Sequence, residues 1–245
     1  MVGIVVLEPS GGWRPRLEEV QIRGLRLYRA SVPVPARPSP KRLERRIRRA
    51  GHLLREAGCR RVLTAEAFSG WPVLEEAGLR RVDPGPLCQA MGAELARAWL
   101  AARHIPPGEA VVALCGDGVD ARLFEAAQTL CPEVRGLILR AGERGRELAV
   151  WLEDRYGLPV LEEDRRACLR LWYAPPPDPP EERDLVLCGP VPALGGLSLQ
   201  PPFDPPEKLA PLPLTALLWE EGRLAPEELR IQLDSTGKST YNVGT

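Results

Sequence analysis

The middle of the chain alternates apolar runs with amphipathic stretches of regular length. The runs at residues 110–115, 136–140, 158–161, 168–174 and 185–189 predict strands, and the stretches at 119–131 and 143–156 predict helices. Strands that alternate with helices of about 10–15 residues are typical of a parallel sheet with right-handed crossovers. We therefore expect an α/β fold with a mainly parallel, doubly wound, Rossmann-like sheet.

The N-terminal part of the chain predicts a second α/β region. Strands are expected at residues 2–7 and 22–32, a helix runs from Ser39 to a stop at Gly58, and a long helix covers residues 85–103. We divide the chain into an N-terminal α/β lobe (1–105), a Rossmann-like lobe that includes a C-terminal helix (106–233) and a flexible tail (234–245).

A seven-residue pattern occurs twice in the predicted N-terminal lobe. The residues EAGCRRV at 56–62 return as EAGLRRV at 76–82. Each copy predicts a helix end, a glycine that caps it, two arginines and the start of a strand. Two copies are too few for a repeat array that buries a stacked core, so we interpret them as two successive helix-to-strand connections.

Charge and hydropathy exclude several classes of protein. The formal net charge is zero, which argues against a general nucleic-acid binder. The basic stripe on the helix at 41–55 has no interleaved aromatic residues for base stacking, so we interpret it as a solvated face. No apolar run reaches the roughly 18 residues that a membrane span needs, and no signal-peptide pattern is present. We expect a cytoplasmic protein without a membrane or nucleic-acid partner.

The side chains that commonly perform catalysis form no recognisable motif. Six cysteines occur without a CxxC pair, and the only histidines are His52 and His104, so no metal site is predicted. Most of the cysteines stand among apolar residues, and we expect them to be buried, reduced thiols. Catalytic residues stay unassigned.

The strongest candidate for a binding site is the glycine turn after the strand at 110–115. Gly116, Gly118 and Ala121 fit the pattern G-x-G-x-x-[GA] between a strand and a helix, which is typical of a turn that holds a pyrophosphate. Arg140 ends the next predicted strand, where an arginine can accept the 2′-phosphate of NADP. Asp120 has an alternative role as the cap of the following helix.

Residues 83–161 resemble, in their organisation, the coenzyme domain of shikimate dehydrogenases and glutamyl-tRNA reductases. The shared features are a long helix, a strand, a glycine turn, a helix and a second strand that ends in arginine. The resemblance implies a Rossmann-type domain with its cofactor at the Gly116–Ala121 turn. The chain as a whole is similar to uncharacterised proteins of clostridial bacteria, which implies no function.

Two functions follow as hypotheses. The first is a non-catalytic or degenerate Rossmann-like module that binds a nucleotide or a protein partner. The second is an NADP-dependent oxidoreductase with its cofactor at Gly116, Gly118, Ala121 and Arg140. The shortage of candidate acids, bases and nucleophiles favours the first.

Overall fold

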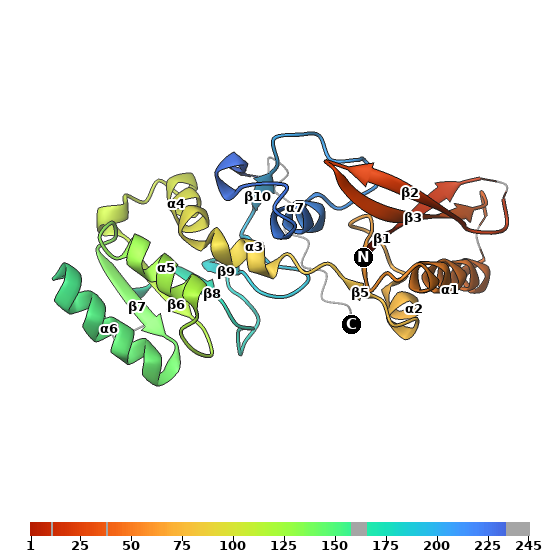
Figure 1. Cartoon of the computed structure of the whole chain (residues 1–245). Coiled ribbons are helices and arrows are strands. Elements are labelled where there is room, and N and C mark those ends of the chain that lie inside the picture. The colour runs from red at the N-terminus through yellow and green to blue at the C-terminus, as the bar shows by residue number, and fades with distance from the viewer. Residues whose placement is uncertain (11, 38, 158–165, 234–245) are drawn as a thin grey trace. The chain divides into compact units, whose positions relative to one another are not determined.

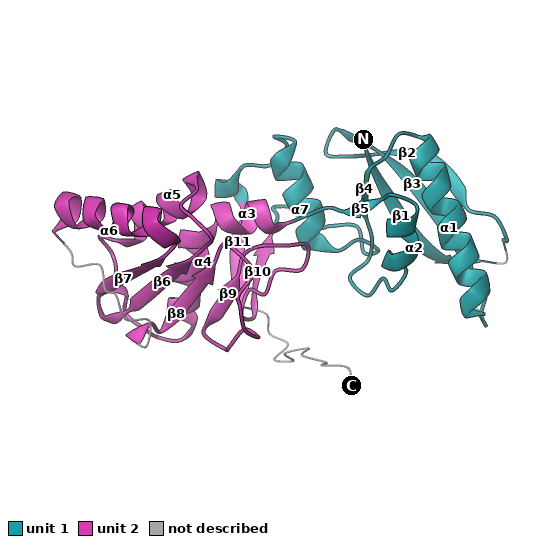
Figure 2. Cartoon of the chain, turned by 90° about the horizontal axis from the view of Figure 1, so that it is seen from below, with its two compact units in different colours: residues 1–83, 201–228 teal, residues 84–200, 229–245 magenta. Residues whose placement is uncertain are grey.

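The computed structural model describes residues 1–10, 12–37, 39–157 and 166–233. The chain forms two compact units, which Figure 2 shows in different colours. Unit 1 comprises residues 1–83 and 201–228, and unit 2 comprises residues 84–200 and 229–245. Residues 84–105, which the sequence analysis grouped with the N-terminal lobe, thus belong to unit 2, and residues 201–228, which it grouped with the Rossmann-like lobe, belong to unit 1.

Unit 1 contains a mixed sheet of five strands (Figure 1). Its strands are β1 (Val2–Pro9), β2 (Arg16–Ile22), β3 (Leu25–Val34), β4 (Arg61–Leu63) and β5 (Arg80–Arg81). They follow the order β2-β3-β1-β4-β5, in which only the β2–β3 pair is antiparallel. The sheet is therefore mostly parallel, as an α/β fold requires.

The strand predicted at 22–32 is instead part of a β-hairpin. Arg23 and Gly24 form a turn between β2 and β3, with φ angles of 46° and 78°. Positive φ at both central residues suits the twist of a two-residue hairpin. The sequence pattern missed β2 because most of its residues are exposed, so its side chains do not alternate between apolar and polar.

Helices complete the core of unit 1. They are α1 (Pro40–Glu56), α2 (Trp71–Glu76) and α7 (Pro211–Glu220), and a 3-10 turn covers Pro226–Glu228. The buried face of α1, which includes Ile47, Ala50 and Leu54, packs with Val5 and Val32 of the sheet. At the start of α7 the Ala210 N–H donates to the Thr64 carbonyl at 2.8 Å, which ties this helix to the end of β4.

Unit 2 contains a sheet whose four strands are all parallel. They are β6 (Val111–Cys115), β7 (Gly136–Arg140), β8 (Leu169–Trp172) and β9 (Asp184–Val186), in the order β7-β6-β8-β9. This confirms the predicted α/β class and the parallel pairing. The strand predicted at 158–161 and the tail predicted at 234–245 lie outside the described residues.

The helices of unit 2 are α3 (Gly85–Ala90), α4 (Gly92–Ala102), α5 (Ala121–Leu130) and α6 (Gly142–Tyr156), and a 3-10 turn covers Pro107–Glu109. The single helix predicted at 85–103 is therefore two helices that meet at Met91. The aromatic rings of Phe124 in α5 and Trp151 in α6 lie 5.4 Å apart, so these helices lie side by side. No described helix is long and apolar enough to cross a membrane.

Two short strands form a separate ribbon in unit 2. β10 (Leu197–Gln200) and β11 (Arg230–Leu233) pair antiparallel, with Leu197 opposite Leu233. Both strands contact α4. The segment between the two strands, residues 201–228, belongs to unit 1. The chain therefore leaves unit 2 after β10 and returns to it at β11.

Candidate ligand site at the carboxyl edge of the parallel sheet

The glycine turn lies where the connections of the unit 2 sheet change direction. Gly116 follows β6, whose connection leads through α5 to β7 on one side. On the other side of β6 lies β8, which leads onward to β9. Ligands of open α/β sheets bind outside the carboxyl ends of the strands at such a switch point. The turn therefore occupies the place in the fold where a ligand crevice is expected.

The two glycines of the turn have different surroundings. A Cβ atom on Gly116 would lie 3.0 Å from Leu123 Cδ1 and 3.2 Å from the carbonyl oxygen of Gly118, so only glycine fits without movement. A Cβ atom on Gly118 would meet no heavy atom within 4 Å. Gly116 is thus needed to form the corner, whereas the exposed backbone at Gly118 is open to an approaching group.

The structure confirms that Asp120 caps helix α5. Its Oδ1 atom accepts a hydrogen bond from the Leu123 N–H at 2.8 Å. Ala121 lies exposed in the first turn of the helix, while Leu123 packs against Gly116. Ala121 therefore stands beside the turn but does not make the close helix–strand contact of the third small residue in dinucleotide folds.

Arg140 lies at the same edge as the turn. It ends β7 directly opposite Cys115, and its carbonyl oxygen accepts a hydrogen bond from the Gly116 N–H at 2.9 Å. Of the four residues that the sequence analysis named, Gly116 and Arg140 are therefore hydrogen-bonded neighbours, while Gly118 and Ala121 follow Gly116 along the chain.

Helix α6, which the sequence analysis predicted at 143–156, also starts at this edge, but the sequence analysis did not name its N-terminus as part of the site. Gly142 is the first residue of the helix and has a φ angle of 65°. A Cβ atom added to Gly142 would lie 3.9 Å from the carbonyl oxygen of Asp117. Its N-cap residue is Ala141, whose side chain forms no capping hydrogen bond. The first-turn N–H groups of a 15-residue helix can therefore be directed to a ligand.

A buried tyrosine lies behind the turn. Tyr173 follows β8, and its N–H donates to the Cys115 carbonyl at 2.7 Å. Its side chain is only 8% exposed, and its hydroxyl has no hydrogen-bond partner among the described residues. Burial, followed by the negative charges of Asp120 and Glu94, raises the pKa of this phenol well above its usual value. The hydroxyl stays protonated at any physiological pH.

Two polar side chains connect this tyrosine to the helices around it. Gln89 of α3 donates from Nε2 to the Tyr173 carbonyl at 2.9 Å. Arg122 of α5 donates from Nη1 to Gln89 Oε1, also at 2.9 Å. The chain of contacts holds the ends of α3, α5 and β8 in a fixed arrangement, which sequence reasoning missed because the three residues are far apart in the chain.

The cysteines are all free thiols, and four of the six are buried: Cys59, Cys88, Cys115 and Cys131. Burial raises the pKa of Cys59 and of Cys131, which makes these thiols less reactive. Cys115 ends β6 and Cys188 lies two residues after β9, and these two strands are separated by β8 in the sheet. In the part of the chain that the structure describes, no three His, Cys, Asp or Glu side chains form a group that could hold a metal ion.

Comparison with known proteins adds no relative: no family model matches the chain, and no curated protein has a significantly similar sequence.

Proposed function

We propose that unit 2 is a Rossmann-like module that binds the phosphate groups of a nucleotide at its carboxyl edge, and that it does so without catalysing a reaction. The observation that carries this proposal is the position of the Gly116–Ala121 turn at the switch point of a parallel sheet. The exposed backbone at Gly118 gives a ligand access to the turn.

The phosphate site is expected nearer to α6 than to α5. The carboxylates of Asp117 and Asp120 repel an anion, and Asp120 already occupies the N-terminus of α5 as its cap. The N-cap of α6 is Ala141, whose side chain forms no capping hydrogen bond, and Arg140 lies two residues before the helix; the first turn of α6 carries one carboxylate, that of Glu143. A phosphate held between Arg140 and the start of α6 would gain both a positive charge and backbone donors.

Binding rather than catalysis is favoured by the roles of the polar side chains around the turn. Asp120 caps a helix, and Gln89 and Arg122 hold the backbone of Tyr173. The raised pKa of Tyr173 makes it a poor general base. Each of these groups has a structural role that explains its position.

Substitution of Gly118 tests the proposed site. A nucleotide at a hundred times its dissociation constant stabilises a protein by about 2.7 kcal/mol, which raises the melting temperature by about 5–10 °C for a chain of this size. We expect such a shift in a thermal melt with NADPH, NADH, ATP or S-adenosylmethionine. Gly118→Asp adds a third carboxylate to the turn and should abolish the shift.

Gly108→Asp is a matched control for this experiment. Gly108 also has no heavy atom within 4 Å of an added Cβ, but it lies before β6, at the opposite end of that strand. This variant should keep the full shift. If none of the four nucleotides raises the melting temperature of the wild-type protein, the nucleotide proposal is wrong, and a module that binds a protein partner becomes the better account.

The second candidate function is an NADP-dependent oxidoreductase, and the position of Arg140 favours it. In dinucleotide folds, the residue at the end of the second strand contacts the ribose, and an arginine there accepts the 2′-phosphate. Arg140 has the corresponding place at the end of β7, next to β6. A cofactor bound at this edge would supply hydride transfer, while this chain would contribute the turn, the α6 N-terminus and Arg140.

Replacement of Arg140 tests whether the site distinguishes NADPH from NADH. We expect Arg140→Ala to raise the dissociation constant for NADPH about tenfold, because one charge-assisted hydrogen bond is lost, and to change that for NADH much less. Arg135→Ala is the control, because Arg135 is exposed directly before the amino end of the same strand, and it should change neither dissociation constant. Equal effects of Arg140→Ala on both cofactors, measured by fluorescence titration, would contradict 2′-phosphate recognition.

A further inference from the structure

The arginine pair that occurs twice in the sequence comes together in space in unit 1. Each copy ends a helix at a glycine with positive φ, Gly58 at 81° and Gly78 at 76°, and then starts a strand. In the β4–β5 pair Arg61 lies opposite Arg80, and the Arg80 N–H donates to the Arg60 carbonyl at 2.9 Å. The two copies therefore lie side by side, with their arginines at the amino ends of the strands.

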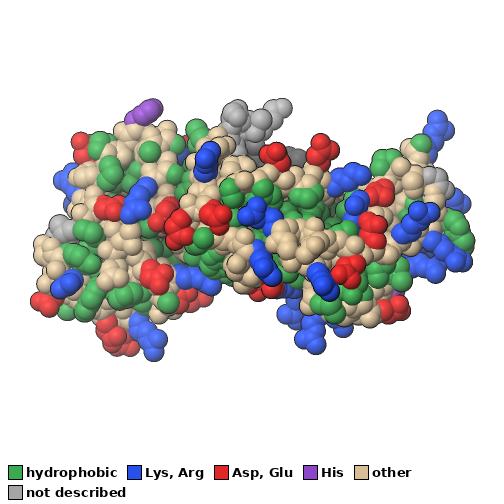
Figure 3. Space-filling model, turned by 45° about the horizontal axis from the view of Figure 1, so that its top comes forward, with side chains coloured by type: hydrophobic (Ala, Val, Ile, Leu, Met, Phe, Trp, Pro, Cys, Tyr) green, Lys and Arg blue, Asp and Glu red, His purple; other side chains and the backbone are tan. Residues whose placement is uncertain are grey.

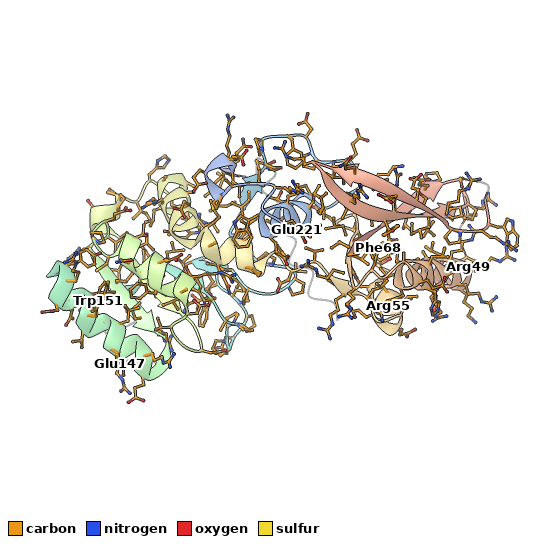
Figure 4. All side chains as sticks on the ribbon, in the orientation of Figure 1. Arg49, Arg55, Phe68, Glu147, Trp151 and Glu221 are labelled. Atoms are coloured by element: carbon orange, nitrogen blue, oxygen red, sulfur yellow. The ribbon has the colours of Figure 1, made fainter. Side chains whose placement is uncertain are left out.

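These arginines surround an open cavity of about 540 Å³. The cavity is lined by Met1, Arg55, Arg60, Arg61, Gly78 and Arg80. Arg55 comes from the last turn of α1, and Figure 4 shows it on the side of that helix where α2 lies. Four arginines thus line one cavity, and none of the lining residues is acidic.

Two of the four positive charges already have partners within unit 1. Arg61 forms an ion pair with Glu220, and Glu221 lies 3.8 Å from its second terminal nitrogen. Arg55 donates to the Cys59 carbonyl at 3.5 Å, and its charge also compensates the negative end of the α1 dipole. These contacts explain Arg55 and Arg61 without a ligand.

The side chains of Arg60 and Arg80 have no comparable partners among the described residues. Within the described ranges, neither side chain has a carboxylate within ion-pairing distance, and both are exposed at the cavity. Guanidinium groups are weakly hydrated and donate pairs of parallel hydrogen bonds to phosphate and carboxylate groups. The two unpaired arginines therefore provide the selective attraction of this cavity for anions.

The size and lining of the cavity restrict the kind of anion. Its volume of about 540 Å³ falls in the range of roughly 300–1,000 Å³ that is usual for small-molecule sites. No aromatic residue lines it, so it offers no surface on which a nucleic-acid base could stack. We propose that this cavity binds a compact polyanion, a small molecule with two or more phosphate or carboxylate groups.

This site is independent of the nucleotide site proposed in unit 2. It lies in unit 1, at the amino ends of strands, and shares no residue with the glycine turn. Each proposal can therefore fail without the other.

Isothermal titration of the full chain tests the proposal, with tripolyphosphate and citrate as probes at matched ionic strength. We expect saturable binding with one ligand per chain for at least one probe. The double variant Arg60→Gln/Arg80→Gln should weaken that binding at least tenfold. Circular dichroism should show the wild-type spectrum for this variant, because both side chains are exposed.

The control removes two arginines from the same unit but away from the cavity. Arg45 and Arg49 are exposed on α1, and Figure 4 labels Arg49 on this helix. Figure 3 shows Lys and Arg side chains, in blue, gathered at the right of the view. The double variant Arg45→Gln/Arg49→Gln should bind the probes like the wild-type protein.

The two probes distinguish the sources of negative charge. Binding of tripolyphosphate alone would identify a phosphate compound as the ligand class, and binding of citrate alone would identify a polycarboxylate. The absence of saturable binding with both probes would overturn the proposal. Equal losses in the cavity variant and the α1 variant would also overturn it, because they would show non-specific attraction to a basic surface.

Discussion

Replacement of Asp184 by alanine is expected to lower the free energy of unfolding by about 3–5 kcal/mol, the largest effect of any change considered. Asp184 is 4% exposed at the start of β9. Its carboxylate accepts hydrogen bonds from Arg170 Nε and Nη2, from the Trp172 indole at 3.0 Å and from the Glu181 N–H at 2.7 Å. Without it, these donors lose a common acceptor in a site that water barely reaches.

Chemical denaturation followed by circular dichroism measures this loss. Asp178→Ala is the control, since Asp178 is exposed in the connection that leads to β9, and its removal should change stability by less than about 0.5 kcal/mol. A loss below about 1 kcal/mol for Asp184→Ala would show that the carboxylate does not organise the β8–β9 region as described.

The same carboxylate makes stability depend on pH. Burial alone would raise the pKa of Asp184, but the hydrogen bonds from Arg170, from the Glu181 N–H and from Trp172 outweigh it and hold the pKa below its usual value. A group whose pKa is lower in the folded state stabilises that state fully above its unfolded pKa of about 3.9. The difference between wild type and Asp184→Ala should therefore shrink as the pH falls below about 4.

The second large effect is expected from Gly92→Ala at the start of α4. A Cβ atom at this position would lie 2.2 Å from the hydroxyl oxygen of Tyr173 and 3.2 Å from its Cζ atom. In an open helix, this substitution would gain up to about 1 kcal/mol. Here the overlap with a buried ring dominates, and we expect a net loss of about 1–3 kcal/mol in the free energy of unfolding.

A double-mutant cycle tests the cause of that loss. Tyr173→Phe removes the atom that overlaps, so Gly92→Ala should cost about 1 kcal/mol less in the Tyr173→Phe background. Tyr173→Phe by itself should be neutral or slightly stabilising, because the hydroxyl has no partner among the described residues. Additive effects would show that the tyrosine hydroxyl does not limit the approach of α4.

Much of unit 2 could be predicted from the chain itself. The apolar runs at 110–115 and 136–140 became the parallel strands β6 and β7, and Asp120 became a helix cap. Both are local signals: a buried parallel strand needs consecutive apolar residues, and a cap needs an acceptor directly before the helix. The glycine turn was located for the same reason.

Other features depend on neighbours that no local pattern reveals. β2 is a strand because it pairs with β3, not because of its own apolar residues. In the sequence, Asp184 has no feature that distinguishes it from a surface aspartate. In the structure, Arg170 and Trp172 of the neighbouring strand donate hydrogen bonds to it. The side chain of Tyr173 is constrained by Gly92, which lies about 80 residues earlier in the chain.

The sequence by itself determined the α/β class, the parallel pairing of the middle segment and the position of the glycine turn, because hydrophobic periodicity and turn chemistry act over a few residues. Only the tertiary structure decided which strands became neighbours, and with that which charges met. The repeated Arg-Arg pair illustrates the difference, since its two copies surround one cavity only because β4 and β5 lie side by side. Strand order depends on burial and pairing across the whole unit, and these are long-range interactions.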